Sequence, residues 1–492
     1  MTVLIVGAGT AGLTLARALA RQGRKFVVFD SASTSARLQD RGLGLWGRSQ
    51  AVLRALGLSD LLDDPARTLR IPAAAYRSRA GHWLSASSDT AANRVRVSTL
   101  LESELLAALE DGLPPGSVQR GATLVGAETG ADGVALTLAD GSRVEGTALV
   151  GADGVCSTVR RLVPFGGGSG AAVDTGYIAH SGVLLPGSGA PANLGGSVHR
   201  GESGHGAADG GGDLAAELLR NAAPVLDASV SKGTARASAR ASAGAGASTF
   251  YSAPATAAAV PAHAFETLSL GRRFAMVPLA RGGAFWFATR RVGVGDAGEG
   301  VGGTALRELR EAYDGWHEPI PQVLHFAACA AAEAAMGGPS ASAGGGPRWE
   351  RLWTAPTLPS WQASSRVVLV GDAAHGMPIN LAQGAACGIE GAYLLSEAFE
   401  QVGDGWLSEG RLSAAFAMYE VQHMPRVRQC RAVTTFTDLL ARPSTPAAEA
   451  ARDAMRFVPP PLNGLIFDAA LELSLGDAPQ STRACWPLCT AA

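Results

Sequence analysis

The sequence is poor in charge, in cysteine and in long apolar runs, and each shortage excludes a class of protein. Charged residues make up 17% of the 492 residues and the formal net charge is −2, so the electrostatics give no reason to expect a nucleic-acid partner. The six cysteines are too few for a disulfide framework, and we expect free thiols in a reducing compartment. Cys485 and Cys489 lie close together in sequence, but with no histidine or second cysteine pair nearby we assign them no metal or redox role.

Membrane and export signals are also lacking. No stretch reaches the roughly 18 uninterrupted apolar residues that a membrane-spanning helix requires. The first twenty residues are apolar, yet they have no basic region of the kind that opens a signal peptide. We therefore expect a soluble, cytoplasmic protein without a membrane span.

What the chain has in excess is glycine, at 63 residues. Part of this excess lies in a tract at about residues 187–262 that consists mostly of Gly, Ala and Ser, and a second such tract runs from Gly337 to Gly346. Ordering a backbone costs about 1–2 kcal/mol per residue, and these tracts have little apolar surface to offset it. We predict that the first tract is a disordered insertion.

The remaining pattern predicts a chain of alternating strands and helices, long enough for two subdomains that bury a large cofactor. The chain begins with a βαβ unit and ends with a helical tail that three prolines interrupt. The expected elements are strand Thr2–Val6, helix Leu13–Gln22, strand Phe26–Phe29, a loop and helix over Gly42–Leu58, helix Leu100–Leu109, a β-meander over Ala122–Val150, strands in Tyr177–Leu185 and Phe274–Arg291, strand Val367–Val370, helix Gln383–Gln401, and the prolines Pro459–Pro461.

The other glycines lie in turns, the first of which is Gly7-Ala8-Gly9-Thr10-Ala11-Gly12. After a strand, Gly7 permits a sharp turn, Gly9 lets the backbone approach a pyrophosphate, and Gly12 lets the helix pack closely on the strand. The helix N-terminus stabilises the phosphates, and Asp30 is spaced to accept hydrogen bonds from a ribose hydroxyl. The pattern also arises by chance in glycine-rich chains, but the flanking strand and helix and Asp30 favour a dinucleotide site. This site alone does not separate NAD from FAD.

A second turn follows the strand that ends at Val150. The segment from Gly151 to Arg160 places Asp153, a turn glycine and an arginine in one strand-to-helix crossing. The alternative interpretation is an Asp-Gly turn with a helix cap at Ser157. Taken alone, the segment does not decide between the two.

The third turn begins with Gly371 and Asp372 and continues to Gly384. An acidic residue at a strand end binds polyol hydroxyls, and a turn of small residues that opens a long helix directs amide N–H groups at an anion. Reduced flavin carries such a negative charge at its N1–C2=O edge, so a helix N-terminus there favours the reduced state. His375, between alanines and glycine, is better explained as a structural residue than as an acid or base.

Taken in order, the three turns resemble the flavin-dependent aromatic hydroxylase family, the group A FAD-dependent monooxygenases that include para-hydroxybenzoate and salicylate hydroxylases and zeaxanthin epoxidase. The resemblance implies an α/β fold in which a Rossmann-like FAD-binding domain, with its βαβ unit, is interleaved with a β-sheet substrate domain and followed by a helical C-terminal region. We expect residues 1–175 and 350–440 to form the first, 176–349 the second, and 441–492 the tail.

The resemblance also assigns roles to matching positions. It places Gly7, Gly9, Ala11, Gly12 and Asp30 on the ADP moiety, Arg41 and Asp153 near the pyrophosphate, Gly371 and Asp372 on the ribityl chain, and Pro378, Ala382 and Gly384 at the flavin edge. Two positions depart from the family pattern. Ala382 stands where the family often has glycine, and Ser98 or Thr99 occupies the slot of a flavin-contacting arginine, with Arg94 and Arg96 just upstream.

The resemblance predicts an enzyme that uses NADH or NADPH and O₂ to hydroxylate or epoxidise an aromatic or polyene small molecule through a flavin C4a-hydroperoxide. No catalytic residue is predicted, because the cofactor performs the chemistry. Phe274, Phe285, Trp286 and Phe287 are candidates for an apolar pocket, and at period two at least half of them belong to sheet packing. Two alternatives remain open: an FAD-dependent oxidase or dehydrogenase on the same fold, and a catalytically degenerate flavin-binding protein. The sequence does not indicate an oligomeric state.

Overall fold

The computed structural model describes residues 2–33, 40–71, 74–86, 97–130, 132–166, 170–184, 263–292, 303–335, 347–403, 405 and 408–458. Several sequence predictions fall outside these ranges. They concern the tract at 187–262, the tract Gly337–Gly346, the arginines Arg94 and Arg96, the prolines Pro459–Pro461, and the cysteines Cys485 and Cys489.

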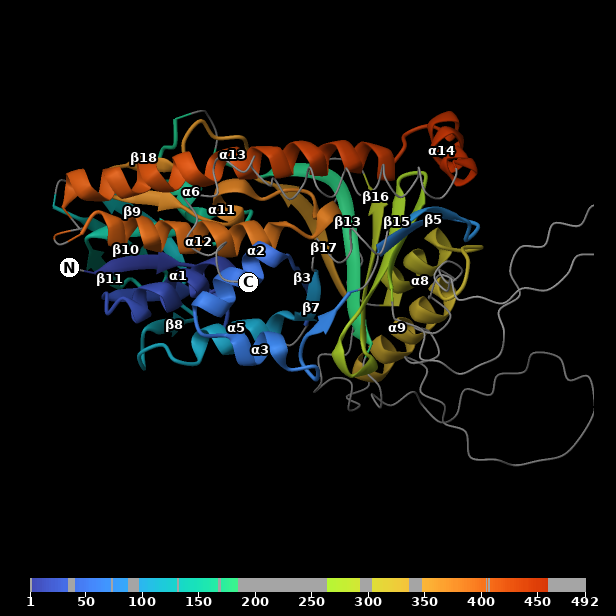
Figure 1. Cartoon of the computed structure of the whole chain (residues 1–492), viewed down its shortest axis with the longest axis horizontal. Helices are drawn as coiled ribbons and strands as arrows, with labels where there is room; N and C mark the ends of the chain where they lie inside the picture. The colour runs from blue at the N-terminus through green and yellow to red at the C-terminus, as the bar shows by residue number, and fades with distance from the viewer. Residues whose placement is uncertain are drawn as a thin grey trace, which may run out of the picture.

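A six-stranded sheet forms the centre of the first half of the molecule (Figure 1). Its order is β18 (Gln362–Ser364), β19 (Val367–Leu369), β12 (Ala148–Gly151), β1 (Val3–Val6), β2 (Phe26–Asp30) and β8 (Val118–Arg120). All neighbours are parallel except β18 and β19. Every residue of β1 and β12 is buried, as expected for parallel strands covered on both faces. The predicted βαβ unit is confirmed, with α1 (Thr10–Arg21) between β1 and β2.

Helices from distant parts of the sequence cover this sheet. Helix α1 packs against α12 (Gly384–Gln401), and α12 packs against α13 (Glu409–Ala441), which runs along one side of the molecule from the first sheet to the second (Figure 1). The shorter helices of this half are α2 (Gly47–Ala55), α3 (Ser59–Asp63), α5 (Glu102–Glu110), α6 (Thr158–Leu162), α11 (Asp372–His375) and the 3₁₀ turn η3 (Ile379–Leu381).

A seven-stranded sheet forms the second half. Its order is β17 (Arg348–Thr354), β13 (Val173–Leu184), β16 (Ala284–Arg291), β15 (Arg272–Pro278), β14 (Ala264–Ser269), β5 (Ala74–Ser78) and β6 (Trp83–Ala86). Helices α8 (Gly303–Ala312) and α9 (Ile320–Ala335) bury one face of it around Trp286 and Tyr313. Turn η2 (Ala280–Gly282) joins β15 to β16, and α14 (Pro446–Asp453) with η4 (Ala454–Phe457) follows α13.

Two small antiparallel sheets complete the fold. One has the order β11 (Arg143–Gly146), β10 (Val134–Leu138), β9 (Leu124–Thr129), and the other β3 (Gly42–Leu45), β7 (Ser98–Leu101), β4 (Leu69–Arg70). The first is the predicted meander. The second shortens the helix predicted from Leu100, because Leu100 and Leu101 pair with β3 and the helix begins at Glu102.

The observed strand pairing differs from the expected division of the chain at β17, which runs past residue 350 but belongs to the seven-stranded sheet, and at β5 and β6. Strands β5 and β6 lie within the segment 1–175, yet β5 pairs in parallel with β14 and joins the seven-stranded sheet, where Figure 1 shows it in blue beside green strands. Backbone hydrogen bonding to β14 decides this placement, and a pairing between residues so far apart in sequence has no local signal. The α/β class, the interleaved β-sheet unit and the helical C-terminal region are confirmed.

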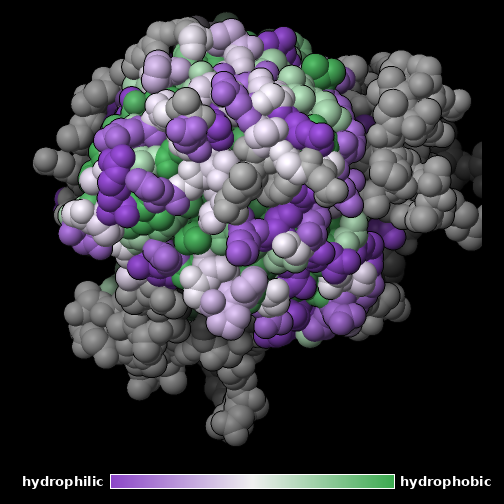
Figure 2. Space-filling view, turned by 90° about the vertical axis from the view of Figure 1, so that its left-hand side faces the viewer, coloured by the Kyte–Doolittle hydropathy of each residue, from purple (hydrophilic) through white to green (hydrophobic). Residues whose placement is uncertain are grey.

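Among the described residues, no helix is both long enough and apolar enough to span a membrane. In Figure 2, which views one end of the molecule, hydrophilic side chains cover much of the face and hydrophobic ones lie between them in small groups.

Candidate functional site

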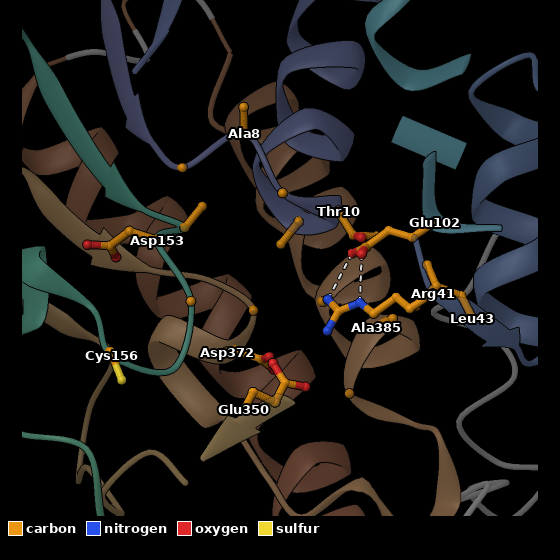
Figure 3. A pocket seen from close by; sticks show the side chains of 18 of the residues that line it. Ala8, Thr10, Arg41, Leu43, Glu102, Asp153, Cys156, Glu350, Asp372 and Ala385 are labelled. Carbon is orange, nitrogen blue, oxygen red and sulfur yellow. Dashed lines mark hydrogen bonds and ion pairs between the residues drawn. The ribbon is translucent and has the colours of Figure 1, made fainter. Parts of the chain in front are cut away.

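A cavity of about 660 Å³ lies between the two large sheets, within the range typical of small-molecule sites (Figure 3). The walls come from both halves: the turn after β1 on one side, and β13 and β16 on the other. Eleven predicted site residues line it: Gly7, Gly9, Ala11, Asp30, Arg41, Asp153, Gly371, Asp372, Pro378, Ala382 and Gly384. Gly12 alone is absent from the wall, because it lies beneath the turn against Gly7.

Three parallel strands bring these residues together. Strands β1, β12 and β19 are neighbours, and the residues that follow their carboxyl ends are Gly7, Asp153 and Asp372. The carboxyl edge of an open parallel sheet is where ligands bind in α/β folds. The structure therefore joins three motifs that are separated by most of the chain.

In the first motif, the absence of a side chain at Gly7 and Gly12 allows close packing, and its absence at Gly9 leaves the backbone open to the cavity. Gly7 has φ +106°, and a Cβ there would lie 2.3 Å from the Ala152 carbonyl oxygen. A Cβ on Gly12 would lie 1.9 Å from the Gly7 carbonyl oxygen, whereas one on Gly9 meets nothing within 4 Å. Gly9 is also the N-cap of α1 and offers no side-chain oxygen, so the positive end of the helix dipole faces the cavity.

Asp30, at the end of β2, helps to build this turn. One carboxylate oxygen accepts a hydrogen bond from the Ala8 N–H at 2.8 Å, and the other accepts one from the Ala32 N–H at 2.8 Å. Arg120 lies 3.6 Å from the same carboxylate. These contacts fix the carboxylate on the cavity wall.

The second motif contains the predicted helix cap as well as the predicted acid. Ser157 is the N-cap of α6 and accepts from the Arg160 N–H, while Asp153 accepts from the Ser157 hydroxyl at 2.5 Å and from the Thr158 and Val159 N–H groups at 2.6 and 3.0 Å. Asp153 therefore shapes the loop after β12 by binding the start of α6. The carboxylate is occupied by these donors rather than extended toward a ligand.

Arg160 connects the second motif to the third. Its guanidinium is almost fully buried and donates to the carbonyl oxygens of Ala373 and Val155, both at 2.5 Å, and of Gly170 at 2.7 Å. A buried cation surrounded by carbonyl oxygens fixes the backbone of both loops.

The third motif depends on small residues. Gly371 has φ +60°, and a Cβ there would lie 2.7 Å from the Ala11 Cβ and 3.9 Å from the Gly388 Cα. The start of α11, the start of α1 and the first turns of α12 thus approach one another without side chains between them. Any larger residue at position 371 would push the helices apart.

The acids and the cation of the cavity wall influence one another. Arg41 makes a bidentate ion pair with Glu102, at 2.6 and 2.8 Å (Figure 3). Burial opposes its charge, but Glu102 outweighs this and raises the pKa of Arg41. Asp372 opens onto the cavity while protein surrounds it elsewhere, so burial raises the pKa of its carboxyl, with Arg41 opposing the shift and Glu102 adding to it.

The turn before α12 carries the departure from the family pattern. Ala382 adopts a left-handed conformation with φ 50° and ψ 30°, and its carbonyl accepts from the Trp46 indole at 3.3 Å. Its methyl group lies near Gly44 of β3, where an added Cβ would be only 3.2 Å away. The absence of a side chain at Gly44 therefore makes room for the methyl group of Ala382.

The other departure concerns the missing arginine. Thr99 is buried and donates to the Pro278 carbonyl at 2.6 Å, and Ser98 is buried beside it in β7. Neither residue lines the cavity. The cation of the described wall is Arg41.

His375 lies outside the cavity wall, in a buried aromatic cluster. Its ring is 5.3 Å from Trp361 and 5.6 Å from His423, and within the described part of the chain neither ring nitrogen has a hydrogen-bond partner. Burial lowers the pKa of His375 to about 3, so the ring is neutral. This environment agrees with a structural residue.

The aromatic residues of the second sheet divide by strand alternation. Phe285 and Phe287 line the cavity, whereas Phe274 and Trp286 are buried in the core on the opposite face under α8 and α9. Sequence reasoning missed Glu102, Cys156 and Glu350, which also line the cavity. None of the three had a signal of its own in the sequence, because their place on the wall depends on how distant elements cross.

Known proteins resemble the chain in sequence. A family model described as an FAD binding domain matches residues 1–179. Aurachin C monooxygenase/isomerase of Stigmatella aurantiaca is 26% identical over 435 residues, which cover 87% of this chain and 86% of that protein. The 6-hydroxynicotinate 3-monooxygenase of Bordetella bronchiseptica is 24% identical over 452 residues, covering 88% and 90%.

A solved structure shares the fold. HpxO of Klebsiella pneumoniae, complexed with FAD and uric acid, aligns with a TM-score of 0.67 at 19% identity, over 96% of this chain and 97% of that one. The glycine turn at the head of the matched FAD-binding domain and the two full-length monooxygenase relatives lead to one conclusion. Residues 1–179 match an FAD-binding domain, and along most of its length the chain is similar to monooxygenases of the flavin-dependent aromatic hydroxylase family, the group A FAD-dependent monooxygenases.

Proposed function

We propose that the protein is a monooxygenase that binds FAD in the cavity, takes electrons from NADH or NADPH, and transfers one atom of O₂ to a small aromatic substrate. The observation that carries this proposal is the convergence of Gly7, Asp153 and Asp372 at the carboxyl ends of three neighbouring strands. Bound FAD would supply the redox and oxygen chemistry, and the protein would supply binding, orientation and exclusion of water.

We infer the following roles on the FAD side. The N-terminus of α1, approached over Gly9, would stabilise the pyrophosphate, and Asp30 would accept a hydrogen bond from the adenosine ribose. Asp372 would accept from the ribityl hydroxyls. The N-terminus of α12 at Gly384 would stabilise negative charge on the flavin edge.

The substrate would occupy the part of the cavity walled by the second sheet. Phe285, Phe287 and Ala179 provide an apolar surface, while Ser181 and the Glu350 carboxylate provide polar groups. This wall suits a flat ring that carries a hydroxyl or ring N–H donor. The two full-length relatives are named for aurachin C and 6-hydroxynicotinate, and we include nitrogen heteroaromatic rings with such donors in the proposed substrate class.

The proposal also assigns a role to each segment of the chain. We propose that residues 1–175 and 350–440 bind FAD, except for β5, β6 and β17, and that residues 176–349 cover the substrate together with these strands. The alternatives are an oxidase or dehydrogenase on the same fold and a catalytically inactive flavin protein.

One set of measurements separates these functions. The purified protein should show the absorbance spectrum of bound FAD, and NADH or NADPH should bleach it anaerobically. In air, a panel of hydroxylated benzoates, hydroxypyridines and hydroxyquinolines should contain a compound that accelerates nicotinamide oxidation and gains one oxygen atom by mass spectrometry, with label from ¹⁸O₂.

Each alternative has its own result. Absence of bound FAD would refute the proposal. FAD that neither nicotinamide reduces would favour the inactive protein, and substrate oxidation with H₂O₂ release and no incorporated ¹⁸O would favour the oxidase.

A further inference from the structure

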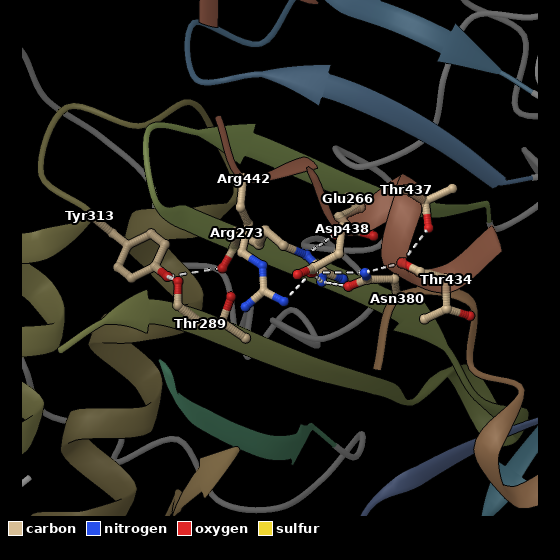
Figure 4. Close-up of polar contacts among 9 residues, drawn as sticks. All are labelled: Glu266, Arg273, Thr289, Tyr313, Asn380, Thr434, Thr437, Asp438 and Arg442. Atoms are coloured by element: carbon tan, nitrogen blue, oxygen red, sulfur yellow. Dashed lines mark hydrogen bonds and ion pairs between the residues drawn. The ribbon is translucent and has the colours of Figure 1, made fainter. Parts of the chain in front are cut away.

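A buried polar network connects the turn before α12 to the second sheet and to α13 (Figure 4). Its central residues do not line the cavity. Its centre is Asn380, in η3, with Arg273 of β15 on one side and Asp438 of α13 on the other. We call these three residues the Asn380 bridge.

Asn380 uses both ends of its amide. The Oδ1 atom accepts a hydrogen bond from Arg273 Nη1, and the Nδ2 group donates to the Thr434 carbonyl at 3.0 Å and to the Asp438 carboxylate at 2.8 Å. A side chain that accepts from a cation and donates to a carboxylate must carry both kinds of group, which Asn does at this length. The three elements are therefore joined by a single residue.

Arg273 is held firmly on its own side. Its side chain is fully buried, it pairs with Glu266 of β14, and its backbone carbonyl accepts from the Tyr313 hydroxyl at 2.9 Å. The guanidinium carbon also lies 5.5 Å from the centre of the Phe287 ring, which lines the cavity. One guanidinium thus contacts the wall of the second sheet and the turn before α12.

The other side is equally fixed. Asp438 pairs with Arg442, and the Arg442 guanidinium lies 3.9 Å from the centre of the Tyr177 ring in β13. The charges balance, with the carboxylates of Glu266 and Asp438 against two arginines. In a buried network whose charges balance, removal of one member leaves its partners without their hydrogen bonds.

The turn that this network holds forms part of the cavity wall. Pro378, Ile379 and Ala382 line the cavity on either side of Asn380, which does not line it. Two residues after Ala382, helix α12 begins. The position of the turn therefore sets where the N-terminus of α12 points and how far it lies from Phe287.

We propose that Asn380 is a positioning residue, which holds the turn and the start of α12 at a fixed distance from the substrate wall so that the helix N-terminus meets the flavin edge. This inference rests on the proposed FAD site. It predicts that loss of the bridge weakens FAD binding and lowers the midpoint potential of bound flavin, because a displaced helix N-terminus stabilises the reduced flavin less well.

The test uses the full-length protein and four variants. N380A removes the bridge. N380D keeps an acceptor for Arg273 but places a second carboxylate next to that of Asp438. D438N in the N380D background restores a donor and acceptor pair. T437A is the matched control, because Thr437 donates to the same Thr434 carbonyl at 3.0 Å without touching the turn.

FAD dissociation constants are measured by flavin fluorescence quenching, midpoint potentials by dye-coupled reduction, and unfolding temperatures on the FAD-free proteins. We expect N380A and N380D to bind FAD about tenfold more weakly with a more negative potential, the double variant to recover part of the loss, and T437A to match wild type.

The outcomes distinguish this inference from the proposed function. A wild-type protein that binds no FAD refutes the proposed function. If the wild-type protein binds FAD and N380A has the same FAD affinity and midpoint potential, the positioning role is overturned. It is also overturned if the only effect of N380A is a lower unfolding temperature. If N380A does not fold, the comparison of N380D with N380D/D438N decides: equal affinities and potentials in these two variants overturn the inference.

Discussion

Three glycine-to-alanine substitutions should separate the two physical roles of the first turn. At Gly7, alanine would adopt φ +106° and place its Cβ 2.3 Å from the Ala152 carbonyl oxygen and 2.8 Å from the Asp153 Cα. Both neighbours are backbone, so neither can rotate away. A left-handed conformation costs a non-glycine residue about 1–2 kcal/mol, and overpacking of this kind costs about 1–3 kcal/mol more. We expect G7A to lose about 2–5 kcal/mol of unfolding free energy and its ability to retain FAD.

Gly23 and Gly9 supply the comparisons. Gly23 has φ +67° with nothing within 4 Å of its missing Cβ, so G23A should show the conformational cost alone, about 1–2 kcal/mol, and bind FAD normally. Gly9 has neither a positive φ nor a neighbour within 4 Å, so G9A should lose about 1 kcal/mol or less, as at other helix N-caps. Its methyl group would nevertheless stand where we propose that the pyrophosphate approaches the backbone, and FAD should then bind at least about tenfold more weakly.

Urea unfolding of the FAD-free proteins measures the first quantity, and titration with FAD measures the second. The expected pattern is a loss of both in G7A, of stability alone in G23A, and of affinity alone in G9A. If G7A is as stable as G23A, the close contact with Ala152 does not constrain the turn. If G9A binds FAD as wild type does, the cofactor does not approach over this residue, and the placement of the phosphates is wrong.

Three further predictions concern single side chains. A382G should raise the unfolding temperature by about 2 °C, because the free energy gained by relieving the left-handed conformation exceeds the free-energy cost of a more flexible unfolded chain. A lower unfolding temperature would show that packing of the methyl group near Gly44 contributes more. Because folding lowers the pKa of His375 from 6.5 to about 3, its contribution to stability is intact above about pH 6.5 and is lost as the pH falls from 6.5 toward 3. H375F should therefore flatten the decline of the urea midpoint between pH 7.5 and 5.5, and parallel declines would contradict this. Cys156 is exposed and lines the cavity, so saturating FAD should slow the part of the reaction with a thiol reagent that C156S removes; a C156S-sensitive phase indifferent to FAD would place the cofactor elsewhere.

The expectations that the structure bears out depended on neighbours in sequence, on strand alternation or on the family resemblance. The turn from Gly7 to Gly12 lies between a strand and a helix that it touches directly, so its geometry follows from local residues. The family resemblance placed Asp153 and Asp372 near it, and the cavity contains both at the carboxyl edge of the parallel sheet. Alternation along β16 likewise separated Phe285 and Phe287 from Trp286.

Other features had no signal in the sequence. The pairing of β5 with β14 depends on hydrogen bonds between segments far apart in the chain, and the partner of Arg41 proved to be Glu102, from the helix that follows β7. Asn380 gave no motif, because its three partners come from β15 and from two turns of α13. Contacts of this kind depend on how helices and sheets cross, which no local pattern specifies.

The sequence by itself determined that the chain has a nucleotide-binding βαβ unit, because backbone conformation at glycine and the succession of strand, turn and helix are local properties. The family resemblance related the three turns to a flavin. The tertiary structure decided how the site is held together. Small residues at Ala11, Gly371 and Gly388 let three helices meet, and buried guanidinium groups at Arg160 and Arg273 join loops from different elements. Close packing and buried hydrogen bonds act between surfaces rather than along the chain, so only the folded structure shows which residues they connect.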